Sequence, residues 1–451
     1  MSKLSQTALD EATAKKVVKD AIRAAGNTSA DELVVGLSWS QVGNTRFANN
    51  GITTTGDVES LNVSITATID GKSATVSGNR IDKKALNELV TQAADLAAVS
   101  PANPEHMPPL GKQKFPRIKG VDAAAAKMGP AQRGEAAAKA IDIAKGAGVV
   151  AAGLVTHAER VSVVASSSGL FGFHPSTEVT MSTTSRTPDG KGSGRAAFVS
   201  HRAKDLDAER LARRATETAT ASSNLKKADP GDYTVLLEAQ AVADLLGFML
   251  GSMGTRAADE GRSFFSKSGG GTKLGLQLFD PRITITSSPE DNDHPSNPWG
   301  GGGLPQQPRT WIESGVLKQL TVSRYWAQKT GAEPIAYPGS IFMAGTSKTL
   351  DDLLKDAGEG IAVSRFWYNR SLEPRSILVT GLTRDGTFRV EGGKKVHAVN
   401  NFRYNDSPIS MLKNVVALGI PERVPTRRGM VMVVPPMVVK GFHFSSTSDA
   451  V

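Results

Sequence analysis

Hydrophobic and polar residues follow a helical period in four long segments of the first half of the chain and a two-residue period in shorter runs. The helical period predicts helices over residues 7–25, 83–98, 131–145 and 206–222. Runs rich in β-branched residues predict strands over residues 32–39, 45–48, 60–69, 73–78, 149–156, 160–166, 178–184 and 196–200. Asp70 and Gly71 indicate a hairpin turn. This order of elements suggests two related halves, although no sequence repeat supports a duplication.

The pattern changes near residues 226–231 (KKADPG), where a turn-rich segment indicates a boundary. Beyond it the chain is richer in glycine, and the predicted strands are short. They cover residues 233–237, 282–286, 360–368, 377–380, 387–391 and 431–434. The predicted fold class is therefore α+β, with a mixed N-terminal domain over residues 1–225 and a β-rich C-terminal domain over residues 226–451.

The stretch VHAVNNFRYNDSPISMLKNV, residues 396–415, combines a strand-like start with a helix-like end. Asp406 and Ser407 can cap a helix, and Pro408 suits its first turn, so a helix is predicted over residues 409–416. This local interpretation gives no role to three polar residues in the same stretch, namely Asn401, Arg403 and Asn405.

Composition is that of an ordinary globular protein, with 39% hydrophobic and 22% charged residues. The absence of cysteine excludes disulfides, thiolate metal sites and a cysteine nucleophile. The start of the chain lacks the apolar segment of a secretory signal, and no window is apolar enough to span a membrane, so a cytoplasmic location is expected. The net charge of +9 is dispersed apart from Arg423, Arg427 and Arg428, which favours a solvated surface over a nucleic-acid site.

Common catalytic motifs are missing from the sequence. There is no G-x-S-x-G elbow and no phosphate-binding loop, since the glycines of residues 268–273 lack the required spacing. The histidines are scattered, at His106, His157, His174, His201, His294, His397 and His443. The densest group of possible metal ligands, residues 290–294 (EDNDH), lacks the pattern of a calcium loop. These patterns therefore predict no metal site.

Several longer stretches carry a resemblance to a known family. They are NTRFANN (44–50), RTWIESGVL (309–317), GIAVSRFWYNR (360–370), TGLTRDGTFRVEGG (380–393) and NFRYNDSP (401–408). Together they resemble the TldD/PmbA (TldE) family, historically called modulators of DNA gyrase and classed with metallopeptidases. The resemblance covers most of the chain and is most specific between about residues 310 and 414.

The resemblance implies a two-domain α+β protein with a curved β-rich C-terminal domain, acting as a dimer that encloses a cavity. In such pairs the TldD-type subunit holds a catalytic metal on an H-E-x-x-x-H helix with a later cysteine, and the PmbA/TldE-type subunit lacks this motif. Here the corresponding helix is expected over residues 236–246, with Ala239, Gln240 and Asp244 in place of the motif residues. An alanine cannot bind a metal and a glutamine cannot act as a general base, so neither a catalytic nor a metal residue is predicted in this chain.

The expected function is that of a non-catalytic, PmbA/TldE-like subunit in a heterodimeric metallopeptidase acting on unfolded or short peptides. The divalent metal, expected to be zinc, would belong to a TldD-type partner. An extended peptide could add to a sheet edge in the chamber. Possible substrate-binding or interface residues are Arg256, Glu260, Asn401, Arg403 and Asn405.

Two other functions remain open on the sequence. One is a homodimeric hydrolase that uses Asp244 or the loop from Asp291 to His294. The other is a protein that binds and modulates a partner such as gyrase, for which the dispersed charge gives little support.

Overall fold

A computed structural model of the chain describes residues 9–426 and 430–448. Its first half contains one large antiparallel sheet with helices on one face. The helices are α1 (Glu11–Ala25), α2 (Lys83–Val99), α3 (Ala123–Ala126), α4 (Pro130–Gly146) and α5 (Ala208–Ala221). The strands are β1 (Glu32–Ala48), β2 (Gly51–Ile69), β3 (Lys72–Gly78), β4 (Val150–Ser166), β5 (Phe171–Arg186) and β6 (Ser193–Ser200).

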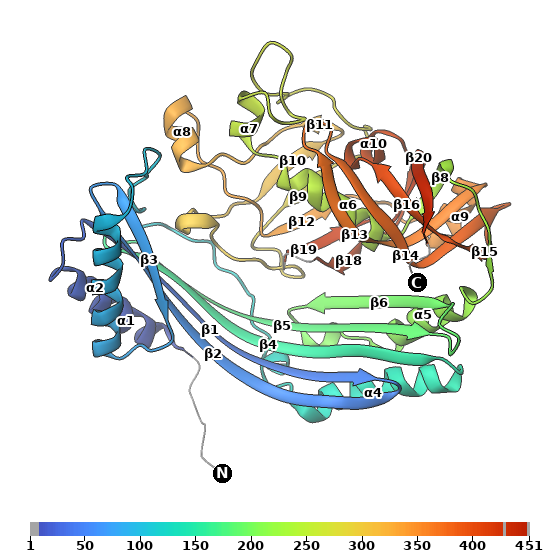
Figure 1. Cartoon of the computed structure of the whole chain (residues 1–451), viewed down its shortest axis with the longest axis horizontal. Helices are drawn as coiled ribbons and strands as arrows, with labels where there is room; N and C mark the ends of the chain where they lie inside the picture. The colour runs from blue at the N-terminus through green and yellow to red at the C-terminus, as the bar shows by residue number, and fades with distance from the viewer. Residues whose placement is uncertain (1–8, 427–429, 449–451) are drawn as a thin grey trace.

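The strand order of this sheet is β3-β2-β1-β4-β5-β6, so the two three-stranded halves meet at β1 and β4. Helices α1 and α2 share a core with β1, β2 and the end of β4, and helices α4 and α5 share a core with β4, β5 and β6 that also includes Phe47 of β1. The helices cover one face of the curved sheet and the second half of the chain lies over the other (Figure 1). The order of elements suggested two related halves, and in the structure each of them contributes three neighbouring strands to the sheet.

The strands of this sheet are longer than the hydrophobic pattern predicts. The predicted strands over residues 32–39 and 45–48 are parts of the single strand β1, and those over residues 149–156 and 160–166 are both within β4. In β1 the joining residues Ser40 and Asn44 face away from the helices and need not be apolar. In β4 the joining residue His157 faces the helices, where it is hydrogen-bonded to Arg133 of α4 (2.9 Å).

The second half of the chain builds two further sheets. Its helices are α6 (Ala239–Gly251), α7 (Thr255–Asp259), α8 (Arg324–Thr330), α9 (Leu350–Ala357) and α10 (Pro408–Lys413). A six-stranded sheet has the order β11 (Val316–Leu317), β10 (Arg309–Glu313), β9 (Ile285–Ser287), β12 (Ser340–Met343), β19 (Val431–Val434) and β18 (Glu422–Pro425).

The other sheet closes on itself as a barrel. Its order is β13 (Gly360–Glu373), β8 (Gly231–Leu237), β20 (Met437–Ser448), β16 (Asn401–Asp406) and β14 (Leu378–Glu391), and β14 also pairs with β13. Strands β15 (Lys394–Val399), β7 (Leu225–Lys226) and β17 (Val415–Leu418) attach to it. Buried aromatic rings fill its interior: Phe366, Phe402, Tyr404, Phe442 and Phe444.

Helix α6 packs between the barrel strand β13 and strands β18 and β19 of the six-stranded sheet. Both sheets and this helix share one hydrophobic core. The structure therefore confirms the predicted α+β fold with a β-rich C-terminal region. The division into domains at residue 226 stays a prediction, although all strands from β7 onward lie outside the first sheet.

The strands predicted over residues 377–380 and 387–391 belong to the single strand β14, and two helix predictions in the second half also need correction. The helix expected over residues 236–246 starts only at Ala239, because Leu236 and Leu237 complete strand β8. The helix expected over residues 409–416 ends at Lys413, and Val415 begins strand β17. The predicted cap is present, since the Ser407 hydroxyl accepts a hydrogen bond from the Ile409 amide.

Two residues of the predicted cationic cluster, Arg427 and Arg428, lie outside the described residues. Among the described helices, none combines the length and the apolar character that crossing a membrane would require.

Candidate functional site

Helix α6 is the element on which the family resemblance would place a metal, and its start is fixed by a buried carboxylate. Glu238 precedes the helix and accepts hydrogen bonds from Arg214 (2.7 Å), Lys395 (3.1 Å) and the Ser364 hydroxyl (3.1 Å). Burial alone would raise the pKa of Glu238, but the charges of Lys395 and Arg214 outweigh it and lower the pKa to about 2. The start of α6 is thereby tied to helix α5 of the first half.

The three positions that correspond to the family motif make structural contacts. Ala239 is completely buried. The Gln240 amide donates to the Asp244 carboxylate (3.0 Å) and to the carbonyl of Pro425 (3.3 Å), and Asp244 accepts from the backbone amide of Phe366 (3.0 Å). A methyl group, an amide donor and one carboxylate already engaged by two donors do not form a zinc ligand set. These three residues therefore do not fit the catalytic metal of a TldD-type subunit. Gln240 and Asp244 instead join α6 to β18 and β13.

A cavity of about 450 Å³ lies along α6 beyond Asp244. Small residues at Ala243, Gly247 and Gly251 recur every four positions and so leave space on one face of the helix. The remaining lining combines apolar and polar side chains: Phe248, Ser252, Tyr337, Asn369, Ser371, Pro374, Ile377, Thr426, Met430 and Met432. This α6 groove has the size and mixed lining of a site for a large side chain or a short peptide segment.

The loop from Asp291 to His294, a candidate site on the sequence, lies at a second cavity of about 350 Å³ between the two halves of the chain. His294 accepts a hydrogen bond through Nδ1 from Arg423 (2.8 Å). Two more histidines, His174 and His201, line the same cavity. Burial lowers the pKa of His174 to about 4, and burial together with Arg423 does the same for His294, so both are neutral at pH 7. Within the described residues no group of side chains is arranged to hold a metal ion.

No pattern in the sequence indicates that these three histidines come together. His174 is on β5, His201 follows β6, and His294 is in a loop of the second half. The three histidines are far apart along the chain, and the packing of the two halves brings them to one cavity.

Arg256 and Glu260 form contacts that connect the two halves. Arg256 makes two hydrogen bonds to the carboxylate of Glu105 (both 2.7 Å) and one to Glu260 (3.0 Å). Its guanidinium also lies 5.4 Å from the centre of the Trp326 ring. Neither residue lines the α6 groove. Arg256 thereby anchors the proline-rich segment of residues 100–120, which contains Glu105, to helices α7 and α8.

Asn401, Arg403 and Asn405 alternate with the buried Phe402 and Tyr404 along β16, so they point away from the aromatic interior of the barrel. Arg403 is exposed, and Asn405 is half-buried. The alternation explains why a stretch with so many polar residues forms a barrel strand.

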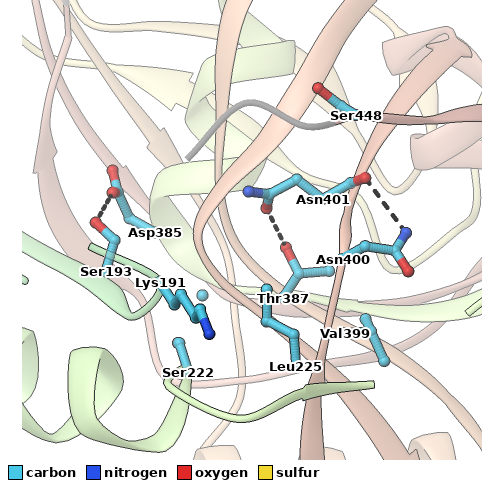
Figure 2. Close-up of a pocket in the computed structure, with 11 residues that line it drawn as sticks. Lys191, Ser193, Ser222, Leu225, Asp385, Thr387, Val399, Asn400, Asn401 and Ser448 are labelled. Atoms are coloured by element: carbon cyan, nitrogen blue, oxygen red, sulfur yellow. Dashed lines mark hydrogen bonds between the residues drawn. The ribbon is translucent and has the colours of Figure 1, made fainter. Parts of the chain in front are cut away.

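Asn401 lines a cavity of about 240 Å³ between the barrel and the first sheet. Its side-chain oxygen accepts hydrogen bonds from the hydroxyls of Thr383 (3.1 Å) and Thr387 (3.0 Å). On the opposite wall the Ser193 hydroxyl donates to Asp385 (2.6 Å), and Lys191 lies between the two pairs (Figure 2). The Ser193–Asp385 hydrogen bond connects β6 to β14 and so supports the packing of the two halves, whereas the bonds of Asn401 join β16 to β14 within the barrel.

Comparison with known proteins assigns the chain to a family. Residues 230–446 match the model of the PmbA/TldA metallopeptidase C-terminal domain, and residues 121–223 match that of its central domain. The curated metalloprotease PmbA of Escherichia coli O157:H7 is 24% identical over 195 residues, which are 41% of this chain and 40% of that protein. The match thus spans about two fifths of the length of this relative.

Two solved structures share the fold over nearly the whole chain. TldE from Thermococcus kodakarensis has a TM-score of 0.83 at 17% identity, covering 95% of this chain and all of that one. A protein described as a candidate modulator of a DNA gyrase, from Thermotoga maritima, has a TM-score of 0.83 at 19% identity, covering 96% of this chain and all of that one. The family models, the curated relative and the shared fold together show that this chain belongs to the PmbA/TldD metallopeptidase family.

Proposed function

We propose that this chain is a PmbA/TldE-like subunit that does not itself cleave peptides and that works with a TldD-type partner in a two-subunit metallopeptidase. The observation that carries the proposal is the state of α6. At the motif positions, Ala239 offers no ligand, and Gln240 and Asp244 are engaged with each other and with the backbone of β18 and β13. The catalytic divalent metal, zinc by analogy with such sites, would be held by the partner.

In this role the chain would close the peptide chamber and help to hold the substrate. The α6 groove supports this part of the proposal, because it offers about 450 Å³ of mostly apolar space beside the backbone of β13. Substrates would be unfolded or short peptides, since an extended segment can lie along a strand and place a side chain in the groove.

Zinc binding and hydrolysis by the chain alone test the non-catalytic part of the proposal. Equilibrium dialysis against zinc should give no tight site, and an unstructured fluorogenic peptide should remain uncut with or without added zinc. The matched control is Asp244→Asn, which keeps the size of the side chain and removes its charge. If the chain cleaves the peptide and Asp244→Asn abolishes this, the proposal is wrong and α6 is an active site.

A homodimeric hydrolase is the second candidate, and the three-histidine cavity is the observation that favours it. His174 and His294 are neutral at pH 7 and could accept a proton. Peptide cleavage by the chain alone that survives Asp244→Asn and is lost in His294→Gln would support this candidate over the first.

A further inference from the structure

The first sheet turns one face to its helices and the other to the second half of the chain, and we call the latter the inner face (Figure 1). Side chains alternate between the two faces along each strand. The inner face therefore carries the even-numbered residues of β1, β4 and β5, those of β2 from Thr54 onward, and the odd-numbered residues of β6. Most of these residues are exposed or partly exposed, so the inner face is accessible to a ligand.

The inner face is polar, and its side chains are short. Serine occupies many of its positions, among them Ser38, Ser40, Ser60, Ser162 and Ser182. The hydroxyls of Thr156 and Thr180 share a hydrogen bond across two neighbouring strands (2.6 Å). No inner-face position of these five strands holds Phe, Tyr or Trp. A stacking platform for nucleic-acid bases is therefore missing, whereas the hydroxyls can donate to and accept from the backbone of an extended peptide.

The charged residues of these strands are sorted between the two faces, although the net charge is dispersed along the sequence. All four arginines lie on the inner face: Arg46, Arg160, Arg186 and Arg195. Three carboxylates lie on the helix-covered face: Asp57, Glu59 and Glu159. The two carboxylates of the inner face are paired, Glu178 with Arg160 (3.1 Å) and Glu32 with His106 (2.7 Å). The inner face therefore carries an excess of positive charge.

The second half of the chain adds cations across from this face. Arg195 lines a cavity of about 60 Å³ beside β6, together with Arg365 of β13 and Arg423 of β18. In all, five arginines and two glutamates line this cavity. Lys191, in the loop before β6, lines the cavity of about 240 Å³ between the barrel and the first sheet. The positive excess thus continues into the space between the two halves.

Arg46 is available to a ligand on this face. Its side chain is exposed, and it forms no ion pair with any described residue. Arg160 is also exposed and lies opposite Ser40, six residues before Arg46 on β1. At about 3.3 Å per residue, the two arginines are about 20 Å apart along the strands. This spacing fits carboxylates that lie several residues apart on an extended peptide, and not the closely spaced phosphates of a nucleic-acid strand.

We propose that the inner face selects unfolded peptides that are rich in Asp and Glu, with Arg46 and Arg160 as residues that attract their carboxylates. The positive excess, the short hydroxyl side chains and the absence of aromatic rings on the inner face together favour an acidic peptide over a nucleic acid. This inference rests on the proposed function, because it takes the substrate to be a peptide that enters the space between the two halves, and it adds the class of peptide.

Peptide binding to the full chain alone tests the proposal. Three unstructured twelve-residue peptides, identical except for four positions that hold Glu, Gln or Lys, carry a neutral dye and are followed by fluorescence anisotropy with a chelator present. At about 20 mM salt the Glu peptide should bind at least about tenfold more tightly than the Gln peptide, and this preference should shrink at about 200 mM salt. Arg46→Glu should weaken binding of the Glu peptide by at least about fivefold and strengthen binding of the Lys peptide.

Lys139→Glu, at an exposed position of α4 on the other side of the sheet, makes the same change of charge and should leave all three affinities unchanged. Three results would overturn the proposal: equal or undetectable binding of the Glu and Gln peptides, an Arg46→Glu variant that binds the Glu peptide as tightly as the unaltered chain, or tighter binding of a twelve-nucleotide oligothymidine than of the Glu peptide. Such a failure leaves the non-catalytic role standing, because that role is tested by zinc binding and hydrolysis. Cleavage by the chain alone would overturn that role whatever the charge of the peptide.

Discussion

The ion pairs around Glu238 provide a stability test whose size follows from the structure. The pKa of this buried carboxyl is lowered from 4.5 to about 2 by Lys395 and Arg214 against the effect of burial. A shift of this size corresponds to about 3 kcal/mol of folding free energy at neutral pH. Because the folded-state pKa is the lower one, this stabilisation is complete above pH of about 4.5 and is lost as the pH falls toward about 2. At pH 3 about 1.5 kcal/mol should remain.

Glu238→Gln removes the charge and nearly preserves the shape, so it should destabilise the protein by about 3 kcal/mol at pH 7 and by about half as much at pH 3. Urea unfolding of both proteins at both pH values, followed by circular dichroism, measures the difference, and the other carboxyls cancel in the comparison. Glu209→Gln, in the exposed Arg213–Glu209 pair, is the control and should change stability little at either pH. The reasoning would be refuted if Glu238→Gln lowered the free energy of unfolding equally at pH 7 and pH 3, or by no more than Glu209→Gln does.

Further predictions concern the packing of α6, the three-histidine cavity and the barrel. Asp244→Ala should cost about 1–3 kcal/mol by leaving the Phe366 amide without its acceptor, whereas Asp244→Asn should cost less; an unchanged Tm in Asp244→Ala would contradict this. The pKa of His294 is lowered from 6.5 to about 4, so between these pH values the imidazole is protonated in the unfolded chain and neutral in the folded one. Stability therefore falls as the pH drops from about 6.5 to about 4, and the Tm measured across this range should fall less steeply in His294→Gln. Phe442→Ala should cost about 3–5 kcal/mol in urea unfolding, because its ring is buried and stacks on Phe366 at 5.5 Å; a loss below about 1 kcal/mol would show that the barrel interior repacks.

Hydrophobic periodicity predicted the fold class and most elements of the first half, where helical and alternating runs are clear. In the second half it missed several elements, among them α7, α8, α9 and the long strand β20. It failed where strands pass through polar sequence. The residues that join the two predicted parts of β1 include Ser40 and Asn44, which lie on the face without helices, and Gln41, which is exposed on the helix-covered face. It also placed the start of α6 too early, since the apolar Leu236 and Leu237 suit a helix as well as the strand that they form.

The candidate site was predictable only in part. The residues that replace the metal motif on α6 are visible in the sequence, but their hydrogen bonds to β13 and β18 depend on tertiary packing. The same is true of Arg256, which was expected in the chamber or at an interface and whose partner Glu105 lies 151 residues away along the chain. The three-histidine cavity depends on packing between distant segments, and no local sequence pattern predicts it.

Peptide hydrolysis in the presence of a TldD-type partner is the measurement that tests the central claim most directly. The chain, a paralogue carrying H-E-x-x-x-H, and their equimolar mixture are each given an unstructured fluorogenic peptide, with and without a chelator. The account predicts that this chain alone is inactive, that the mixture cleaves faster than the paralogue alone, and that the chelator abolishes cleavage. Metal-dependent cleavage by this chain alone, or a mixture no faster than the paralogue, would contradict it.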